Sequence, residues 1–594
     1  MNEQLAISQL NRALSLLQHG QPAAAKPILL KVCQAFPDSP QLYFALGLAC
    51  AALLQNEAAL EHFAKAIELA PTFAAAYINQ GVLLKKMGQP AKAIACYNQA
   101  MALQPASAAV LNNRGSAYLM LHQVDEAISD FKQALELEPG YADAYCNLGN
   151  AFTELNRFEA ARLALQQALA LDSSMADAHL ALGNALDGLQ RFDEAVASFD
   201  AAIQLNPRYA AAFCNKGNAL RTLARYDEAL SCYERALKLQ PADVAAMRGK
   251  ANTLVGLQRY PEALAQFDRA LALEADQALT RFDKGLLLLL LGDYASGWAL
   301  YEARKQHEKL ARYTCNLRQF DWPEWQGERE LAGKTLLLHQ EQGLGDTLQM
   351  LRYVPLLAEL GAKVVLQVSA PLQRMAASVQ GASRVVTRVE DLPEIDLHCP
   401  FMSLPYRFQT TLATVPASVP YLAVPSDVHE AWAARLPATG RPRIGVVWSG
   451  SRQHRNDHNR SIDWPTFAGL FTLPAEFHSL QKDYREDGAM RAAAGVEDHA
   501  ESLQDFADTA GLIAQLDAVI TVDSSVAHLA AALGKPTWIL LPANPDFRWG
   551  LESEQTPWYP TVRLFRQPAA GDWSAVLQAV KACAQYHLGL ATAG

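Results

Sequence analysis

Several features that would narrow the function are missing from this 594-residue chain. Its nine cysteines stand singly without a CxxC pair, which argues against a disulfide framework or a zinc finger. No block of lysines and arginines interrupts the formal net charge of −10, so we expect neither nucleic acid nor an anionic membrane as the main partner. The first residues, MNEQLAISQL, lack a secretory signal, and the longest aliphatic run is far below the ~20 residues that span a bilayer. We therefore expect a cytoplasmic globular protein without a transmembrane segment.

The common enzyme signatures are missing as well. The sequence has no GxGxxG after a strand, no P-loop, no HExxH and no GxSxG. The cluster HRNDH, from His454 to His458, is a weak candidate for a metal site because it stands alone in a loop. We predict no metal and no other cofactor.

A 34-residue repeat dominates the first half of the sequence. Small residues recur at fixed positions in each unit, and a proline ends most units. Two antiparallel helices per unit explain this, because small residues fit where helices cross and proline closes the second helix. The recurring glycines are Gly47, Gly81, Gly115, Gly149, Gly183 and Gly217. The pattern resembles the tetratricopeptide repeat (TPR) over roughly residues 6 to 310.

Asparagines recur in the first helix of these repeats. One set is Asn79, Asn113, Asn147 and Asn215, and a second set, three residues further along, is Asn150, Asn184, Asn218 and Asn252. A spacing of three places both sets on one helix face, which lines the concave groove in TPR proteins. Their amides could bind a peptide backbone without reading its sequence, as in the similar asparagine ladder of protein O-GlcNAc transferases. Alternatively, they are solvated or bond within the repeat.

After the repeats, the pattern changes to strands alternating with helices. In the first half, the strand-like runs TLLLHQ and AKVVLQVS flank LQMLRYVPLLAELG, which we predict to be one amphipathic helix. The strand-like run RIGVVWSG opens a second half. We predict a TPR solenoid of about eight repeats at 1–277 and a transition at 278–333. Trp298, within the transition, belongs to a last helix that docks onto the next domain. Rossmann-like lobes follow at 334–428 and 441–594.

The segment ITVDSSVAHLAAALGKP places polar side chains between a strand and a helix. Asp523 ends the strand, Ser524 and Ser525 lead into a helix that begins near Val526, and His528 lies in its first turn. Free backbone N–H groups at a helix start attract anions, so this turn suits a diphosphate. Serine or aspartate is also an ordinary helix cap, which leaves a purely structural role open.

Two motifs resemble glycosyltransferase family 9, the ADP-heptose:lipopolysaccharide heptosyltransferases. DSSVAHLAAALGKPTWIL is similar to that family's donor-phosphate motif, and QGLGDTLQMLRYVPLL is similar to its N-terminal Gly-Asp motif. The resemblance implies the metal-independent GT-B fold, with a nucleotide-sugar on the C-terminal lobe and the acceptor on the N-terminal lobe. It also implies that Asp346 is the general base, with Gly343 and Gly345 giving it clearance. The alternative for Asp346 is a helix cap.

Positive charge near the leaving diphosphate should help transfer. Arg452, Arg455 and Arg460 lie in the loop after RIGVVWSG, and Arg460 is our candidate for the phosphate-binding cation, with Lys482 second. The family has a lysine where this chain has Ile462. The chain also has Ser525 where family members usually have glycine, and its first lobe is short.

We therefore predict a glycosyltransferase that moves a sugar from a nucleoside-diphosphate sugar to an acceptor hydroxyl. The TPR array would recruit a protein acceptor or partner. The alternative is a TPR adaptor whose glycosyltransferase-like domain is degenerate and inactive. The missing lysine at Ile462 and the short first lobe favour this alternative, whereas the intact Asp346, Asp523 and His528 favour the enzyme.

Overall fold

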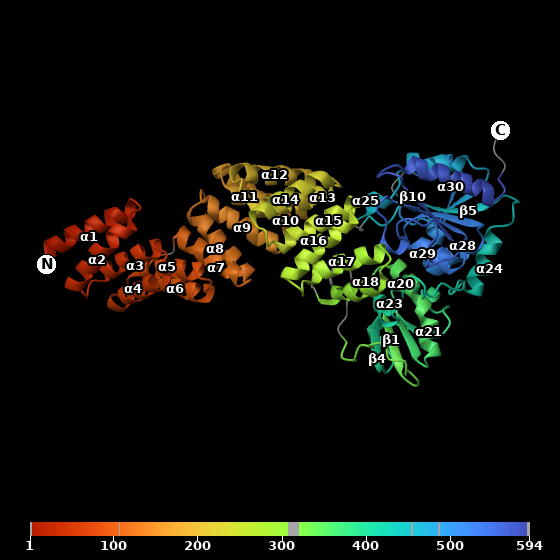
Figure 1. Cartoon of the computed structure of the whole chain (residues 1–594), viewed down its shortest axis with the longest axis horizontal. Helices are drawn as coiled ribbons and strands as arrows, with labels where there is room; N and C mark the ends of the chain where they lie inside the picture. The colour runs from red at the N-terminus through yellow and green to blue at the C-terminus, as the bar shows by residue number, and fades with distance from the viewer. Residues whose placement is uncertain (1–2, 106, 307–319, 453–455, 485–487, 591–594) are drawn as a thin grey trace. The chain divides into compact units, whose positions relative to one another are not determined.

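A computed structural model describes residues 3–105, 107–306, 320–452, 456–484 and 488–590. The chain forms two compact units, Met1–Thr253 and Leu254–Gly594 (Figure 1). The second unit therefore contains the last repeat helices together with both α/β lobes. No helix in the described part of the chain is both long and apolar enough to cross a bilayer.

The N-terminal region is a series of antiparallel helix pairs, as the 34-residue period predicts. Each first helix is followed within a few residues by its partner. Its helices are α1 (Glu3–Gln18), α2 (Pro22–Ala35), α3 (Pro40–Ala52), α4 (Asn56–Leu69), α5 (Ala74–Lys86), α6 (Pro90–Leu103), α7 (Ala108–Met120), α8 (Val124–Leu137), α9 (Ala142–Glu154), α10 (Phe158–Leu171), α11 (Ala176–Gly188), α12 (Phe192–Leu205), α13 (Ala210–Thr222), α14 (Tyr226–Leu239) and α15 (Val244–Gly256).

The recurring glycines make close packing within each pair possible. A Cβ added to Gly183 would lie 2.4 Å from the ring of Phe199 on the second helix of its pair. Gly47 has the same relation to Phe63, where the distance would be 2.6 Å. The small residues predicted to lie at helix crossings are therefore required there by sterics.

The second unit opens with α16 (Tyr260–Leu273), α17 (Ala278–Leu290), α18 (Tyr294–Tyr301) and the short 3-10 helix η1 (Glu302–Gln306). The first lobe follows with a parallel sheet of strand order β3-β2-β1-β4 among the described residues. Its elements are β1 (Thr335–His339), α20 (Leu344–Met350), η2 (Leu351–Tyr353), α21 (Val354–Glu359), β2 (Lys363–Gln367), α22 (Gln373–Ala376), β3 (Ala382–Val386), β4 (Leu397–Pro400) and α23 (Leu404–Arg407).

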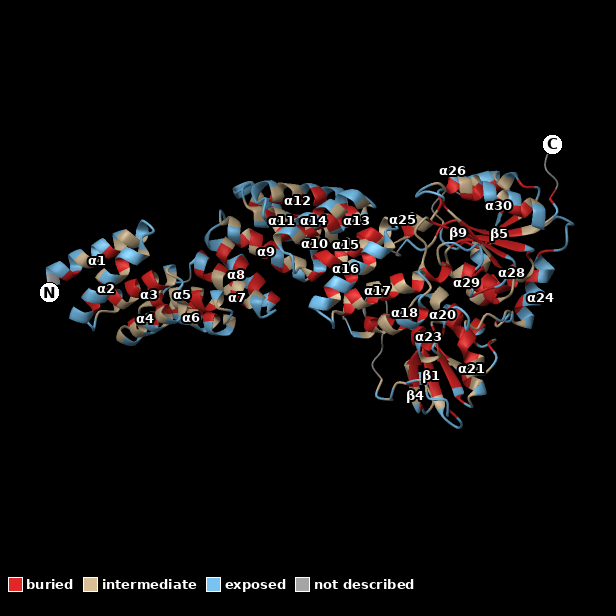
Figure 2. Ribbon diagram, viewed as in Figure 1, coloured by how far each residue is buried: buried red, intermediate tan, exposed pale blue. Residues whose placement is uncertain are grey.

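The second lobe is a larger parallel sheet of order β10-β9-β8-β5-β6-β7 within the described part of the chain. Its strands are β5 (Arg443–Val447), β6 (Glu476–Ser479), β7 (Val496–Asp498), β8 (Ala518–Val522), β9 (Thr537–Leu541) and β10 (Val562–Arg566). Its helices are α24 (Ser426–Arg435), α25 (Asp457–Arg460), α26 (Trp464–Ala468), α27 (Gly488–Ala493), α28 (Phe506–Ala514), α29 (Ser525–Ala532), η8 (Phe547–Trp549) and α30 (Trp573–His587). Figure 2 shows the central strands of this sheet buried.

The strand orders identify where a ligand would bind. In the second lobe, chain order runs outward in one direction from β5 through β6 to β7, and in the other from β8 through β9 to β10. This is the doubly wound order of Rossmann-like folds, in which ligands bind beyond the carboxyl ends of the two strands at the reversal. Here these strands are β5 and β8, and in the first lobe they are β1 and β4.

The predicted fold class is confirmed, but one helix prediction is wrong in detail. The stretch LQMLRYVPLLAELG was predicted as one amphipathic helix, whereas α20, η2 and α21 divide it. Pro355 explains the break, since it has no N–H to donate to the preceding turn. The short strands β3, β4, β7 and β10 were not predicted.

Candidate active site

Two helix starts carry the predicted chemistry, one from each lobe. Helix α20 follows β1 and brings Asp346 into its first turn, while α29 follows β8 and begins after Ser524. The two helices pack together: a Cβ on Gly345 would lie 2.8 Å from Cδ2 of His528 and 3.3 Å from Cα of Ser525. A Cβ on Gly343 would lie 3.0 Å from the Asp346 carboxylate. Both glycines are therefore required by the close packing around Asp346 and α29, and the clearance for substrates stays a prediction.

An arginine that was not predicted from the sequence links the start of α20 to the second lobe. Arg548, on η8 after β9, forms an ion pair with Asp346 across the lobes. The same guanidinium donates to Asp546 at 2.7 Å and to the side chain of Gln349 at 2.7 Å. Arg548 is buried, and the charges of Asp546 and Asp346 outweigh that burial and raise its pKa. Since NPDFRWG follows the strand TWILL, the rule that ligands bind beyond strand ends could have identified this residue.

The start of α29 has no side-chain cap from its N-cap residue. Ser524 is the N-cap residue, yet its side chain makes no capping hydrogen bond and instead lies 3.0 Å from the hydroxyl of Thr521. Ser525 and Val526 form the first turn, and both are half-buried. The ordinary capping role proposed as the alternative for Ser524 is therefore not filled by its hydroxyl. Helix α29 ends at Ala532, and Gly534, with a φ of +75°, provides the left-handed residue just beyond its C-cap.

Arg460 lies where the sheet order reverses. Its Nη1 donates to the carbonyl of Asp523 at 3.1 Å, just beyond β8, and its guanidinium packs on Gly450, just beyond β5. Its Nε makes no hydrogen bond among the described residues but lies 3.7 Å from the Asp457 carboxylate, an ion pair that offsets part of its charge. A guanidinium at this point suits a bound anion.

Asp523 has a raised pKa. Burial and the nearby charge of Asp546 raise this pKa to about 6, although Arg460 and Arg548 act in the opposite direction. The carboxyl group is therefore mostly ionised at pH 7 and takes up a proton as the pH falls through about 6.

His528 differs from a simple anion ligand. Its ring is buried, its Nδ1 lies 3.0 Å from the hydroxyl of Tyr559, and it stacks on Trp549 at 5.3 Å between ring centres. Burial, followed by the charges of Arg548 and Arg352, lowers its pKa well below the usual value. His528 is therefore neutral at pH 7, and any contribution to anion binding would be a hydrogen bond rather than a charge.

The other predicted cations are less central. Lys482 is exposed, and its ammonium lies 3.5 Å from the carbonyl of Gln504. Arg452 is also exposed and donates to the carbonyl of Tyr484 at 3.2 Å. Arg455 and His454 lie outside the described residues. Ile462 is buried in the core, so nothing at that position replaces the family's lysine.

The last repeat helices hold both sides of this site. On the first lobe, Arg304 forms a buried ion pair with Glu341 at 2.7 Å, directly before α20. On the second lobe, the ring of Trp298 meets Phe547 edge-on at 5.6 Å, next to Arg548. The docking role predicted for Trp298 is confirmed, and α18 with η1 fixes the two loops that carry Asp346 and Arg548.

The repeats of the first unit contain a polar hollow of about 450 Å³. Of the predicted groove asparagines, Asn147, Asn150 and Asn184 line it, together with Lys85 and Tyr209. Several of the predicted asparagines also bond within the repeats, as the alternative required. The pairs are Asn79 to the carbonyl of Ala75, Lys85 to Asn113, Asn147 to Asn112, Asn215 to Asn184 and Tyr233 to Asn218.

Family models match both parts of the chain. Tetratricopeptide repeat models match residues 10–72, 72–139, 106–174, 146–210, 214–271 and 249–306. The model of glycosyltransferase family 9 (heptosyltransferase) matches residues 483–565, a range that contains Asp523, α29 and Arg548 but not Asp346. The chain therefore combines an N-terminal TPR region with a C-terminal glycosyltransferase family 9 domain.

Similar proteins include Protein FlbA of Caulobacter vibrioides, with 26% identity over 330 residues. The match covers 51% of this chain and 54% of FlbA, so the chain spans about half of that relative's length. Among solved structures, YrrB, titled a TPR protein with an unusual peptide-binding site, has 29% identity and a TM-score of 0.27, covering 32% of this chain and 98% of YrrB. The Cut9–Hcn1 hetero-tetramer of APC/C has 18% identity and a TM-score of 0.37, and the match covers 41% of this chain and 48% of that chain.

Proposed function

We propose that the second unit transfers a sugar from a nucleoside-diphosphate sugar to an acceptor hydroxyl. The observation that carries this proposal is the meeting of α20 and α29 at the reversal points of two parallel sheets. Gly345 of α20 packs there against Ser525 at the amino end of α29, and the neighbouring Asp346 carboxylate forms an ion pair with Arg548 of the second lobe. A base for the acceptor and a cradle for the donor diphosphate then stand on opposite sides of one reacting carbon.

In this mechanism the acceptor hydroxyl oxygen attacks the anomeric carbon of the sugar. The bond from that carbon to the diphosphate oxygen breaks, and the diphosphate leaves with the electron pair. Asp346 accepts the hydroxyl proton, and Arg548 orients its carboxylate through the ion pair. The backbone N–H groups of Ser525 and Val526, together with Arg460, stabilise the charge that develops on the diphosphate.

The TPR hollow serves a separate purpose in this proposal. Asn147, Asn150 and Asn184 lie on α9 and α11 and line the hollow with amide donors and acceptors. These groups suit the backbone of an extended peptide from a protein acceptor or partner. Replacing Asn147 and Asn184 with alanine should weaken binding of that partner. Asn79→Ala is the matched control, because Asn79 bonds to its own helix and does not line the hollow.

A thermal-shift panel of nucleoside diphosphates and nucleotide-sugars tests the donor site. A ligand that binds only the folded protein raises its melting temperature, so at least one nucleotide should do so. Arg460→Gln should reduce the shift, whereas Arg452→Gln should leave it unchanged, since Arg452 is exposed and bonds to Tyr484. If no nucleotide shifts the melting temperature, the inactive-adaptor alternative replaces this proposal.

A further inference from the structure

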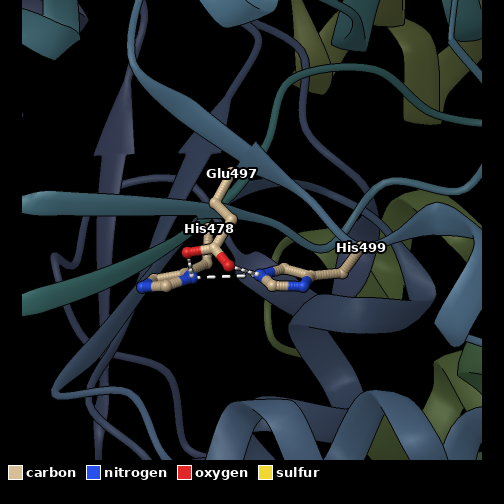
Figure 3. A group of neighbouring side chains, drawn as sticks. All are labelled: His478, Glu497 and His499. Carbon is tan, nitrogen blue, oxygen red and sulfur yellow. Dashed lines mark hydrogen bonds and ion pairs between the residues drawn. The ribbon is translucent and has the colours of Figure 1, made fainter. Parts of the chain in front are cut away.

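A second cluster of reactive side chains lies on the other arm of the second lobe's sheet. His478 is on β6, Glu497 is on the edge strand β7, and His499 follows β7 directly. Figure 3 shows the two imidazole rings with facing nitrogens and the Glu497 carboxylate turned toward the gap between them. Within the described residues, these three groups form the cluster whose ligand atoms could hold a metal ion.

The sheet itself brings these side chains together. His478 and Glu497 are direct partners in the parallel pairing of β6 with β7, so both side chains leave the sheet on the same face. His499 is two residues after Glu497, a spacing that returns to that face in an extended chain. The cluster was not predicted from the sequence, because about twenty residues separate His478 from Glu497 and His499.

The distances suit a small divalent ion. Nδ1 of His478 lies 3.0 Å from Nε2 of His499 and 3.3 Å from the Glu497 carboxylate. The third edge, from Nε2 of His499 to that carboxylate, is 3.9 Å. A tetrahedral ion with ligands at 2.0–2.1 Å separates its ligand atoms by about 3.4 Å. One ion at the centre of this triangle would therefore reach all three groups with shifts of a few tenths of an ångström.

The surroundings hold the two rings in place and leave one side of the cluster accessible. Both imidazole rings are buried, His478 almost completely. The Glu497 side chain is 56% exposed, which leaves a route for an ion from solvent. Two neutral rings and one carboxylate give the site a charge of −1.

Two cations face the cluster from neighbouring elements. The positive charge of Arg443 faces His478. Arg443 also forms an ion pair with Glu476 at 3.3 Å, and this ion pair offsets the charge of the arginine. Arg435 acts on His499 and lies over the ring of Trp432 at 5.2 Å. That same tryptophan ring packs edge-on against His499, which holds the imidazole in place from α24.

We propose that His478, Glu497 and His499 bind one divalent transition-metal ion of the zinc class. Two imidazole nitrogens and one carboxylate are a common ligand set for such ions, with the remaining position open to water. The ion would tie the short edge strand β7 to β6. This site is separate from the Asp346 site and does not depend on the proposed transfer reaction.

Titration calorimetry with zinc ions on the full-length, chelator-stripped protein tests the site. Wild type should bind one equivalent of zinc. Glu497→Gln should bind no zinc, or bind it with an affinity at least about tenfold lower, because a charged ligand is removed. Glu497 is exposed, so this variant should fold. Glu501→Gln is the matched control, since Glu501 is an exposed carboxylate close in sequence but outside the cluster.

Two further measurements keep the test decisive. Zinc should raise the melting temperature of wild type and of Glu501→Gln, but not of His499→Asn or Glu497→Gln. Cobalt ions should give visible d–d absorption in wild type that disappears in Glu497→Gln. The proposal is contradicted if wild type binds no zinc, or if Glu497→Gln and His499→Asn bind zinc as wild type does. The contact between His478 and His499 would then be only a hydrogen bond.

Discussion

The repeats of the first unit and the last repeat helices of the second have the same local design but different packing. Within residues 1–253, buried side chains form small clusters, each shared by a few neighbouring helices. In residues 254–594, one continuous core extends from Ala278 to Leu590 through both lobes. The same helix pair is therefore a local module in one place and a structural support for a binding site in the other.

The largest loss of stability should come from replacing one buried aromatic side chain in each region with alanine. Trp298→Ala should cost about 3–5 kcal/mol and expose the second lobe, because its ring packs against Phe547 and Trp558 of that lobe. Phe199→Ala should cost a comparable amount but open only the helices around α12. Hydrogen exchange read by mass spectrometry distinguishes the two patterns. If the second lobe were equally protected from exchange in both variants, the difference in packing between the two regions would be contradicted.

A buried ion pair should rank next. Arg304→Met leaves Glu341 buried without its partner, and we expect a loss of about 3–5 kcal/mol, since removing one partner of a buried pair is strongly destabilising. Arg191→Ala removes the exposed pair with Glu194 in the first unit and should have no measurable effect. Chemical denaturation of both variants provides the comparison, and similar midpoints would contradict it.

Close contact between the lobes should be sensitive to a single methyl group. Gly345→Ala pushes against His528 and Ser525 and should cost about 1–3 kcal/mol by overpacking, together with a loss of nucleotide binding. Gly469→Ala is the matched control, because a Cβ there meets open space. If Gly345→Ala were as stable as the control and bound nucleotide normally, the two helix starts would not be in tight contact.

The smallest effect should be a change in pH dependence. The pKa of Asp523 rises to about 6 in the folded protein from about 3.9 in an unfolded chain. The folded state therefore holds its proton more tightly, so this group's contribution to stability is lost as the pH rises from about 4 to 6. Asp523→Asn should flatten the free energy of unfolding across that window. An unchanged pH profile would mean that the carboxyl is ionised throughout.

The sequence predicted periodic features well and long-range ones poorly. The glycine and alanine period gave the helix pairs, and the Asp523 turn gave the start of α29, because both depend on neighbouring residues. Arg548 follows a predicted strand, but its pairing with Asp346 depends on how the two lobes meet. The cluster around His478 depends on the pairing of β6 with β7, and local patterns encode neither arrangement. Pro355 in the sequence indicated a break in the helix, but the prediction followed the apolar period instead.

The central claim is that Asp346 acts as a base beside a diphosphate held by α29. Kinetics of Asp346→Asn with whichever nucleotide-sugar stabilises wild type test it most directly. We predict that turnover falls by about 10²–10⁴-fold while nucleotide affinity changes little. Retained turnover with lost affinity would contradict the claim, since Asp346 would then help to bind the donor rather than remove a proton.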